Sequence, residues 1–141
     1  MVDYTRAPSG ALFSVNAQYK QGTGAGALEL TQPVYYNPTT GKWTEMDASA
    51  LATAGAKKGL VGLVSKACSA DGQGVEVCIY DPDLDIGFAV AVGTPVVVST
   101  NAGELAPLSD LTSTNAVTLL FFPTSTTNGI LDPIVCGAVV A

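Results

Sequence analysis

The chain has 141 residues, 48% of them hydrophobic, which is enough for one domain with its own core but not for two domains of ordinary size. Six basic residues against 12 acidic ones give a net charge of −6, which opposes binding to a phosphate backbone and excludes nucleic acid as an expected partner. The chain contains no histidine, and this excludes serine-triad, cysteine–histidine and histidine–zinc chemistry.

The start of the chain predicts an arm. Residues 13–20 alternate between apolar and polar side chains, which is the period of a half-buried strand. Stretches rich in small residues, glycine and proline flank this strand at 7–10 and 22–26, and the second is interpreted as a hinge. We therefore predict an extended N-terminal arm over residues 1–27 and a β-rich body over residues 28–141.

The body predicts an all-β fold, a small β-barrel or β-sandwich of the tulip-like kind. Short segments rich in β-branched and aromatic residues alternate with turn signals at close intervals. At most one short helix is expected, over residues 47–58 with Asp47 as its N-cap, and a loop is the alternative there. The expected strands cover 28–31, 34–36, 42–46, 60–68, 75–80, 88–92, 96–100, 104–105, 116–122 and 134–140.

An internal repeat divides the body into two weakly similar, hairpin-rich halves. Residues 33–41 and 95–103 both begin with Pro-Val and end with glycine, at an offset of 62 residues. Each stretch predicts strand, turn and strand, with the glycine at positive φ. A later match pairs residues 61–64 with 136–139 at an offset of about 75.

The candidate reactive groups predict no catalytic site. The three carboxylates at 81–85 resemble the start of a calcium loop, but the glycine and the glutamate that such a loop requires are replaced by Ile86 and Val92. The cysteines, Cys68, Cys78 and Cys136, match no zinc spacing and are interpreted as reduced thiols, although the first two could face each other across a hairpin. We expect no metal, no cofactor and no enzymatic activity.

Adjacent apolar residues point to a covered or partner-binding sheet. Phe121 and Phe122 are neighbours in a predicted strand and therefore point to opposite faces. The apolar runs at 96–98 and 119–120 suggest the same arrangement, which a small domain achieves most readily by oligomerisation. We therefore predict Phe121 and Phe122 at an oligomer interface.

Together these features resemble a family, the capsid decoration (cement) proteins of tailed bacteriophages. The resemblance is carried by the loose arm, the two Pro-Val hairpins, Gly-Leu-Val at 59–61, Gly-Val-Glu-Val at 74–77 and Ile-Val-Cys-Gly-Ala-Val at 134–139. It implies a structural protein on the outer surface of the virion that catalyses no reaction and clamps neighbouring major capsid subunits as a homotrimer at threefold positions. The chain begins without the features of a secretory signal, so we expect synthesis in the host cytoplasm and no membrane partner.

In this interpretation the arm binds the capsid by adding its strand to an exposed sheet edge. The residues expected to make this contact are Tyr4, Arg6, Phe13, Val15 and Tyr19.

Two other functions stay open at this point. One is a carbohydrate- or receptor-binding module of a phage fibre or adhesin, in which Trp43, Tyr35, Tyr36 and Tyr80 supply an aromatic platform. The other is an enzyme with an unrecognised pair of carboxylates.

Overall fold

The protein is built almost entirely of antiparallel strands, which confirms the prediction of an all-β, barrel-like fold. The computed structural model describes residues 3–6, 10–49 and 60–140. Within these residues the helical structure is limited to one 3-10 turn, η1 (Leu108–Asp110), and no helix has the length and apolar character that crossing a membrane requires. The strands are β1 (Gln18–Thr23), β2 (Pro33–Asn37), β3 (Lys42–Glu45), β4 (Val61–Lys66), β5 (Gly74–Asp85), β6 (Val96–Val98), β7 (Leu105–Pro107), β8 (Ala116–Pro123) and β9 (Asn128–Val139).

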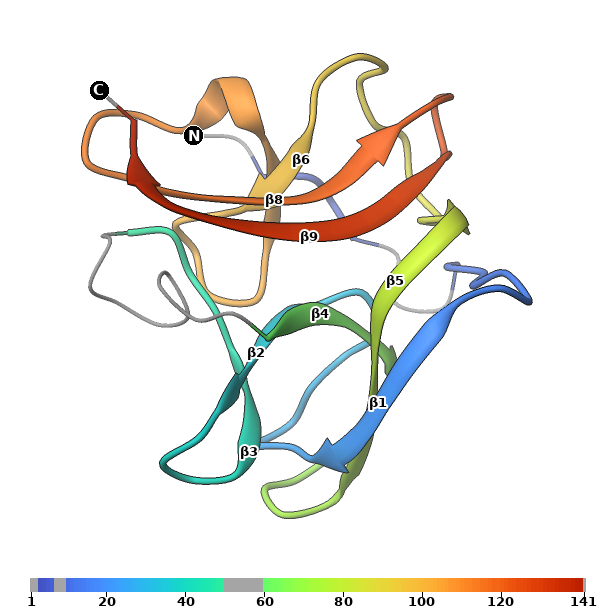
Figure 1. Ribbon diagram of the computed structural model, residues 1–141, viewed down its shortest axis with the longest axis vertical. Helices are drawn as coiled ribbons and strands as arrows, with labels where there is room; N and C mark the ends of the chain where they lie inside the picture. Colours follow the sequence, from blue (N-terminus) through green and yellow to red (C-terminus); the bar gives the residue numbers. More distant parts are fainter. Residues whose placement is uncertain (1–2, 7–9, 50–59, 141) are drawn as a thin grey trace.

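The strand order has an internal symmetry. The sheet runs β3-β2-β4-β5-β9-β8-β6-β7, with β1 paired to β5 outside this path. Read inward from its two ends, the order is β3-β2-β4-β5 and β7-β6-β8-β9, so β2–β5 (the first half) and β6–β9 (the second half) have the same arrangement. Figure 1 shows the first half below and the second above, with β5 extending from one to the other. The two hairpin-rich halves predicted from the sequence are thereby confirmed.

The pairing register of the two hairpins is also the same. Val34 of β2 lies opposite Glu45 of β3, and Val96 of β6 lies opposite Pro107 of β7. Both members of the second pair lie 62 positions after those of the first. The offset found in the sequence is therefore a structural equivalence.

The turn chemistry of the hairpins agrees with this equivalence. Gly41 and Gly103 have φ values of 71° and 76°, a region that favours glycine, as predicted. The second sequence match is wrong, because residues 61–64 lie in β4 and residues 136–139 in β9, whereas the counterpart of β4 in the strand order is β8. That match reflected shared composition only.

A small barrel closes around the first half. β1 pairs with β5 along its whole length, and Gly24 forms a parallel bridge with Trp43 of β3. The Ala25 amide donates to the Trp43 carbonyl (2.9 Å), and the Gly24 amide donates to the Gln73 carbonyl (2.9 Å). The glycine-rich stretch predicted as a hinge is therefore hydrogen-bonded into the body.

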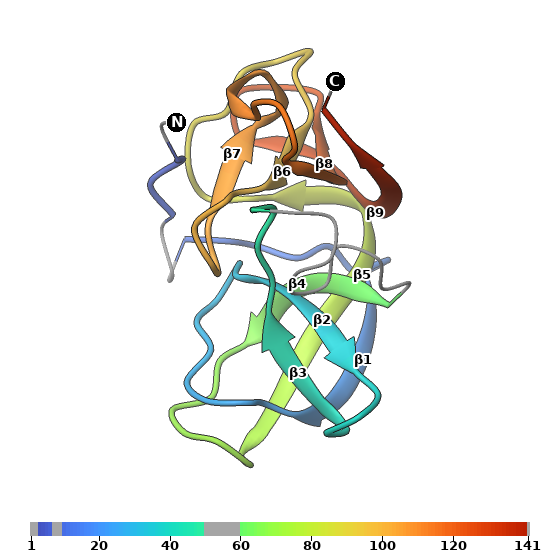
Figure 2. The ribbon, with the colours of Figure 1, turned by 90° about the vertical axis from the view of Figure 1, so that its left-hand side faces the viewer.

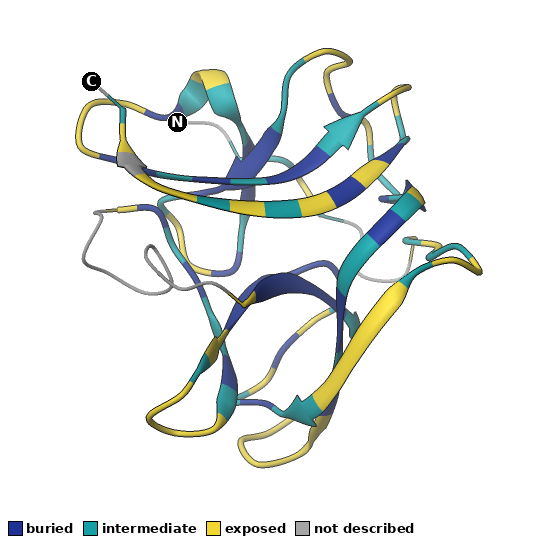
Figure 3. Cartoon of the chain, in the orientation of Figure 1, coloured by how far each residue is buried: buried dark blue, intermediate teal, exposed yellow. Residues whose placement is uncertain are grey.

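Two hydrophobic cores lie on opposite faces of the strands of the first half. The barrel core lies inside the small barrel and contains Val64 and Val77. The main core lies between the two halves and contains their strand neighbours Leu63 and Cys78. β4 is consequently buried on both faces, as the dark ribbon in Figure 3 shows. The apolar run at 96–98 is also fully buried within one chain, so its burial requires no oligomer.

The prediction of an extended arm is wrong for the described part of residues 1–27. The strand in this region is β1, not residues 13–20. Residues 14–17 form a turn in which the Ala17 amide donates to the Ser14 carbonyl (3.2 Å). The apolar–polar alternation arises because Phe13 and Ala17 pack against the main core on either side of this turn, while Val15 points into solvent.

Other predicted elements also differ from the structure. Residues 28–31 contribute only an isolated bridge at Leu28, and residues 88–92 form no strand. Of the predicted helix at 47–58, residues 50–58 lie outside the described residues. At its start the Ser49 amide donates to the Asp47 side chain (3.1 Å) in a turn without helical structure.

A strained backbone position gives the first test of the fold. Thr114 is exposed and has φ of 75°, which a β-branched residue adopts only at a cost. We expect Thr114→Gly to raise the free energy of unfolding by about 1 kcal/mol in urea titrations. The neighbouring exposed Ser113 has no positive φ, so Ser113→Gly should lower it by about 0.5–1 kcal/mol. Equal losses in the two variants would contradict the backbone assigned here.

Candidate functional site

The N-terminal residues 3–6 lie along the outer edge of β7. The Tyr4 amide donates to the Leu105 carbonyl (2.8 Å), and the Tyr4 ring packs against Phe88 with 5.8 Å between ring centroids. Figure 2 shows this segment running beside β7. Tyr4 is half-buried against the main core, so this predicted capsid-binding residue is engaged within its own chain.

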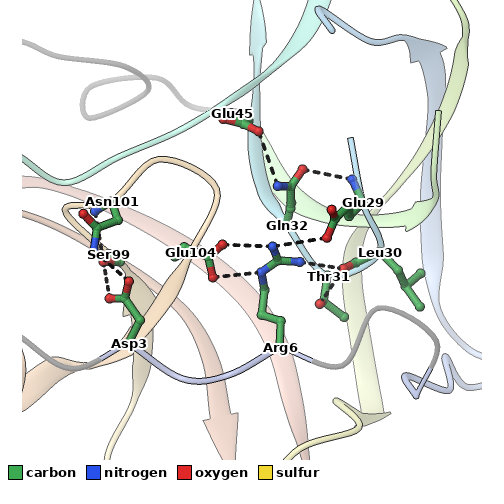
Figure 4. Close-up of polar contacts among 10 residues, drawn as sticks. All are labelled: Asp3, Arg6, Glu29, Leu30, Thr31, Gln32, Glu45, Ser99, Asn101 and Glu104. Atoms are coloured by element: carbon green, nitrogen blue, oxygen red, sulfur yellow. Dashed lines mark hydrogen bonds and ion pairs between the residues drawn. The ribbon is translucent and has the colours of Figure 1, made fainter. Parts of the chain in front are cut away.

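Arg6 joins the two halves of the molecule. Its guanidinium binds Glu104 of the β6–β7 loop through two hydrogen bonds of 3.2 Å and 3.0 Å. It also donates to the Leu30 carbonyl (3.1 Å) and lies 3.6 Å from the Glu29 carboxylate, both in the segment before β2 (Figure 4). The Arg6 side chain is only 7% exposed. This second predicted capsid-binding residue is therefore an internal ion-pair centre.

Asp3 fixes the start of the same segment. Its carboxylate accepts hydrogen bonds from the Ser99 hydroxyl and from the Asn101 side-chain amide (2.8 Å), both in the β6–β7 loop (Figure 4). With Tyr4 and Arg6, this gives three residues of one short segment that bind the second half through specific contacts. The residues that receive them are Phe88, Ser99, Asn101, Glu104 and Leu105.

A second set of contacts fixes the turn that carries Val15. Asp81 is fully buried, and its carboxylate accepts hydrogen bonds from the Ser14 amide (2.8 Å), from the Ser14 hydroxyl and from the Asp83 amide (3.0 Å). The turn is thereby held on β5. Val15 at its tip is 99% exposed.

The remaining predicted arm residues lie beside this turn. Phe13 is half-buried against the main core and contacts Tyr19 edge to face, with 6.2 Å between ring centroids. Tyr19 lies on β1 and is 39% exposed. Partial burial, followed by the nearby Cys78, Asp81 and Glu76, raises the pKa of Tyr19, so the ring keeps its proton at neutral pH. The structure thus brings Phe13, Val15 and Tyr19 together and places Tyr4 and Arg6 elsewhere.

The predicted oligomer interface is only partly available. Phe121 is fully buried in the main core, so its assignment to an interface is wrong. Phe122 points to the other face of β8, is half-buried, and lines a small open pocket of about 120 Å³ with Gly93, Pro95 and Pro123. The sequence did predict that the two rings point in opposite directions, but not which face the chain itself covers.

The aromatic platform proposed for sugar binding does not exist as a surface. Trp43 is 2% exposed and fills the barrel core, and Tyr35 is buried in the main core. Tyr36 is 36% exposed and contacts Trp43 edge to face, while Tyr80 is half-buried on β5. Two of the four rings that would stack on a sugar therefore cannot reach one.

The buried polar side chains of the described residues have hydrogen-bond partners. No group of three or more metal-ligating side chains converges there, and no buried side-chain nitrogen or oxygen lacks a hydrogen-bond partner. The carboxylates at 81–85 diverge, since Asp81 binds Ser14, Asp83 binds Asn128 and Asp85 binds the Gly87 amide.

The three cysteines are free and separate from one another. Cys68 lies in the barrel core and Cys78 in the main core, so they do not face each other across a hairpin. Cys136 is exposed on β9.

Comparison with known proteins finds no matching family model, no matching curated protein and no matching solved structure.

The Arg6 ion pairs give a prediction about stability. Arg6→Ala leaves the Glu104 carboxylate and the Leu30 carbonyl without their partner, so we expect the free energy of unfolding to fall by about 2 kcal/mol in urea titrations. Lys42 forms an exposed ion pair with Asp71 (2.9 Å), and Lys42→Ala should cause a much smaller loss. If the two variants lose the same small amount, Arg6 does not join the halves as described.

The cysteines give a prediction about reactivity. Burial raises the pKa of Cys78 to about 12, so at pH 8 this thiol is both protonated and covered. We expect one fast-reacting thiol per native chain, abolished by Cys136→Ser, and two more on unfolding. Because the pKa of Cys78 is higher in the folded state, its contribution to stability is complete below about pH 9 and is lost as the pH rises toward 12. Fast labelling of Cys78 in the native protein would show that β5 is not packed as described.

Proposed function

We propose that this protein is a structural protein that binds the outer surface of a phage capsid and stabilises it by clamping neighbouring major capsid subunits. The observation that carries the proposal is the exposure of Val15, an apolar side chain held at the tip of a fixed turn. Val15 is 99% exposed, and together with the exposed side chains of Leu12 and Tyr19 it offers an apolar surface suited to a protein partner. The resemblance of the sequence to capsid decoration proteins supplies the partner class.

The contact surface consists of the exposed apolar residues around Val15. Leu12 is 69% exposed and Tyr19 is 39% exposed, and both lie in the segment that carries the turn. We call Leu12, Val15 and Tyr19 the turn patch. Asp81 and Phe13 hold this segment against the body, so binding does not require the entropy cost of ordering a free arm.

This mechanism differs from the one that the sequence suggested. Tyr4 and Arg6 are engaged within the chain, so they contribute to the capsid contact only by holding the N-terminal segment in place. Val15 and Tyr19 remain as direct contacts with the capsid. Phe13 contacts the Tyr19 ring edge to face and so helps to fix its position. Each copy presents a small patch, so firm attachment depends on many copies or on association between copies.

A second apolar surface supports association between copies. Ile130 and Ile134 on β9 are 37% and 46% exposed, and they lie opposite Phe122 and Leu119 of β8. We call Phe122, Ile130 and Ile134 the β9 face. A homotrimer that covers the β9 face and leaves the turn patch toward the capsid is the assembly we propose.

The proposal is tested by mixing the purified protein with undecorated, expanded heads assembled from the major capsid protein encoded in the same genome. We expect saturable binding at threefold positions by electron microscopy, and at least tenfold weaker binding for Val15→Asp, since the new charge must lose water at the contact. The matched control is Thr39→Asp, which adds the same charge at the exposed tip of the β2–β3 loop and should bind normally. Bare heads with the wild-type protein, or a genome without a capsid protein, would contradict the proposal.

A further inference from the structure

Asp81 is a buried carboxylate whose partners are hydrogen-bond donors. It is fully buried on β5, and no lysine or arginine among the described residues forms an ion pair with it. The titratable side chains that interact with it are Tyr19 and Cys78, and burial raises the pKa of both, so they keep their protons at neutral pH and below. The residue opposite it on β9 is Leu131, which is apolar. Within the described part of the chain, hydrogen bonds therefore stabilise its charge.

Three donors point at the two oxygens of this carboxylate. Oδ1 accepts from the Ser14 hydroxyl and from the Asp83 amide (3.0 Å), and Oδ2 accepts from the Ser14 amide (2.8 Å). A protonated carboxyl group carries a donor of its own. That proton would either displace one of the three donors or point into the protein without a partner. Protonation of Asp81 therefore opposes the contacts that hold the turn.

The other acids of β5 do not share this role. Their partners lie elsewhere along the strand and are Gln21 and Ser65 for Glu76, Asn128 for Asp83 and the Gly87 amide for Asp85. Residues 14–17, which form the turn, carry no charged side chain. A change in pH therefore reaches this contact through Asp81 itself.

The turn is tied to the body at both ends by bonds that do not involve the Asp81 side chain. Before the turn, the amides of Leu12 and Asp85 each donate to the carbonyl of the other residue (2.8 Å and 3.1 Å). After the turn, β1 pairs with β5. The bonds between Ser14 and Asp81 thus hold the middle of a short loop whose ends stay paired. Their loss frees residues 14–16 without opening the sheet.

We propose that Asp81 is a pH-dependent latch, which holds residues 14–16 in the turn as a carboxylate and releases them when it is protonated in acidic solution. Release places Val15 on a loose loop, so that the turn patch no longer presents a fixed apolar surface. The latch is a property of the chain itself, and only its effect on capsid binding rests on the proposed function.

The test follows the Ser14 amide of the full-length protein by NMR-detected hydrogen exchange. The pH is lowered from about 7 to about 3, a range in which aspartate side chains take up a proton. We expect the protection of this amide, relative to an unstructured peptide at the same pH, to fall reversibly by about tenfold or more. The amides of Ala25 and Leu28, which are bonded to backbone carbonyls, should keep their protection. Unchanged protection of Ser14, or its loss at the same pH as that of Ala25 and Leu28, overturns the proposal.

Two variants with the same chemical change separate Asp81 from its neighbour. Asp81→Asn replaces an acceptor oxygen with a donor group, so the Ser14 amide should lose protection already at neutral pH and should respond no further to acid. The matched control is Asp83→Asn, which changes an exposed acid of the same strand and should behave as the wild-type protein does. Wild-type protection of Ser14 in Asp81→Asn overturns the proposal, and if this variant does not fold, the wild-type titration decides.

The latch and the capsid contact can fail independently. Absence of binding to heads by the wild-type protein contradicts the proposed function and leaves the latch intact. A Ser14 amide that is insensitive to pH contradicts the latch and leaves the turn patch able to bind. If both hold, Asp81→Asn should bind heads about tenfold more weakly than Asp83→Asn at neutral pH.

Discussion

An antiparallel sheet that does not close on itself leaves edge strands whose backbone groups need partners, and the covering of these edges shapes this protein. Residues 24–25 cover β3 in the first half, and residues 3–6 cover β7 in the second. The second solution brings Arg6 to the junction of the halves, where burial of its guanidinium requires the Glu104 carboxylate and the Leu30 carbonyl close by. Residues 3–6 are therefore a structural part of the body.

Burial of both faces of the central strands is the other consequence of this arrangement. The first half curls around the barrel core, and its outer face packs against the second half across the main core. Adjacent residues such as Leu63 and Val64 are consequently both buried, although they point in opposite directions. A single chain of 141 residues thus achieves an arrangement that apolar runs usually indicate in larger or oligomeric proteins.

Local sequence patterns predicted the fold better than they predicted the surface. The Pro-Val hairpins with Gly41 and Gly103 were predictable because their turn geometry depends on nearby residues, and the structure reproduces their offset. The positions of Phe121, Trp43 and Arg6 were not predictable, because burial of an aromatic or charged side chain depends on strands that are distant in sequence. Residues 13–20 were misleading, since a turn pinned by Asp81 gives the same alternation as a strand. Asp81 lies 67 positions after Ser14, so nothing in the sequence around residues 13–20 indicates that its carboxylate fixes this turn.

Within the described residues, buried polar side chains hold segments of the chain in place, and the exposed apolar side chains include those of the turn patch and of the β9 face. Such a division suits a component of an assembly, in which the interior fixes the shape and the surface is reserved for neighbours. Residues 3–6 complete the second half as residues 24–25 complete the first. Amide hydrogen exchange of the native protein, resolved by residue, tests this arrangement most directly. The account predicts slow exchange of the Tyr4 amide, comparable to that of Ala25, and exchange of Tyr4 at the rate of an unstructured peptide would contradict it.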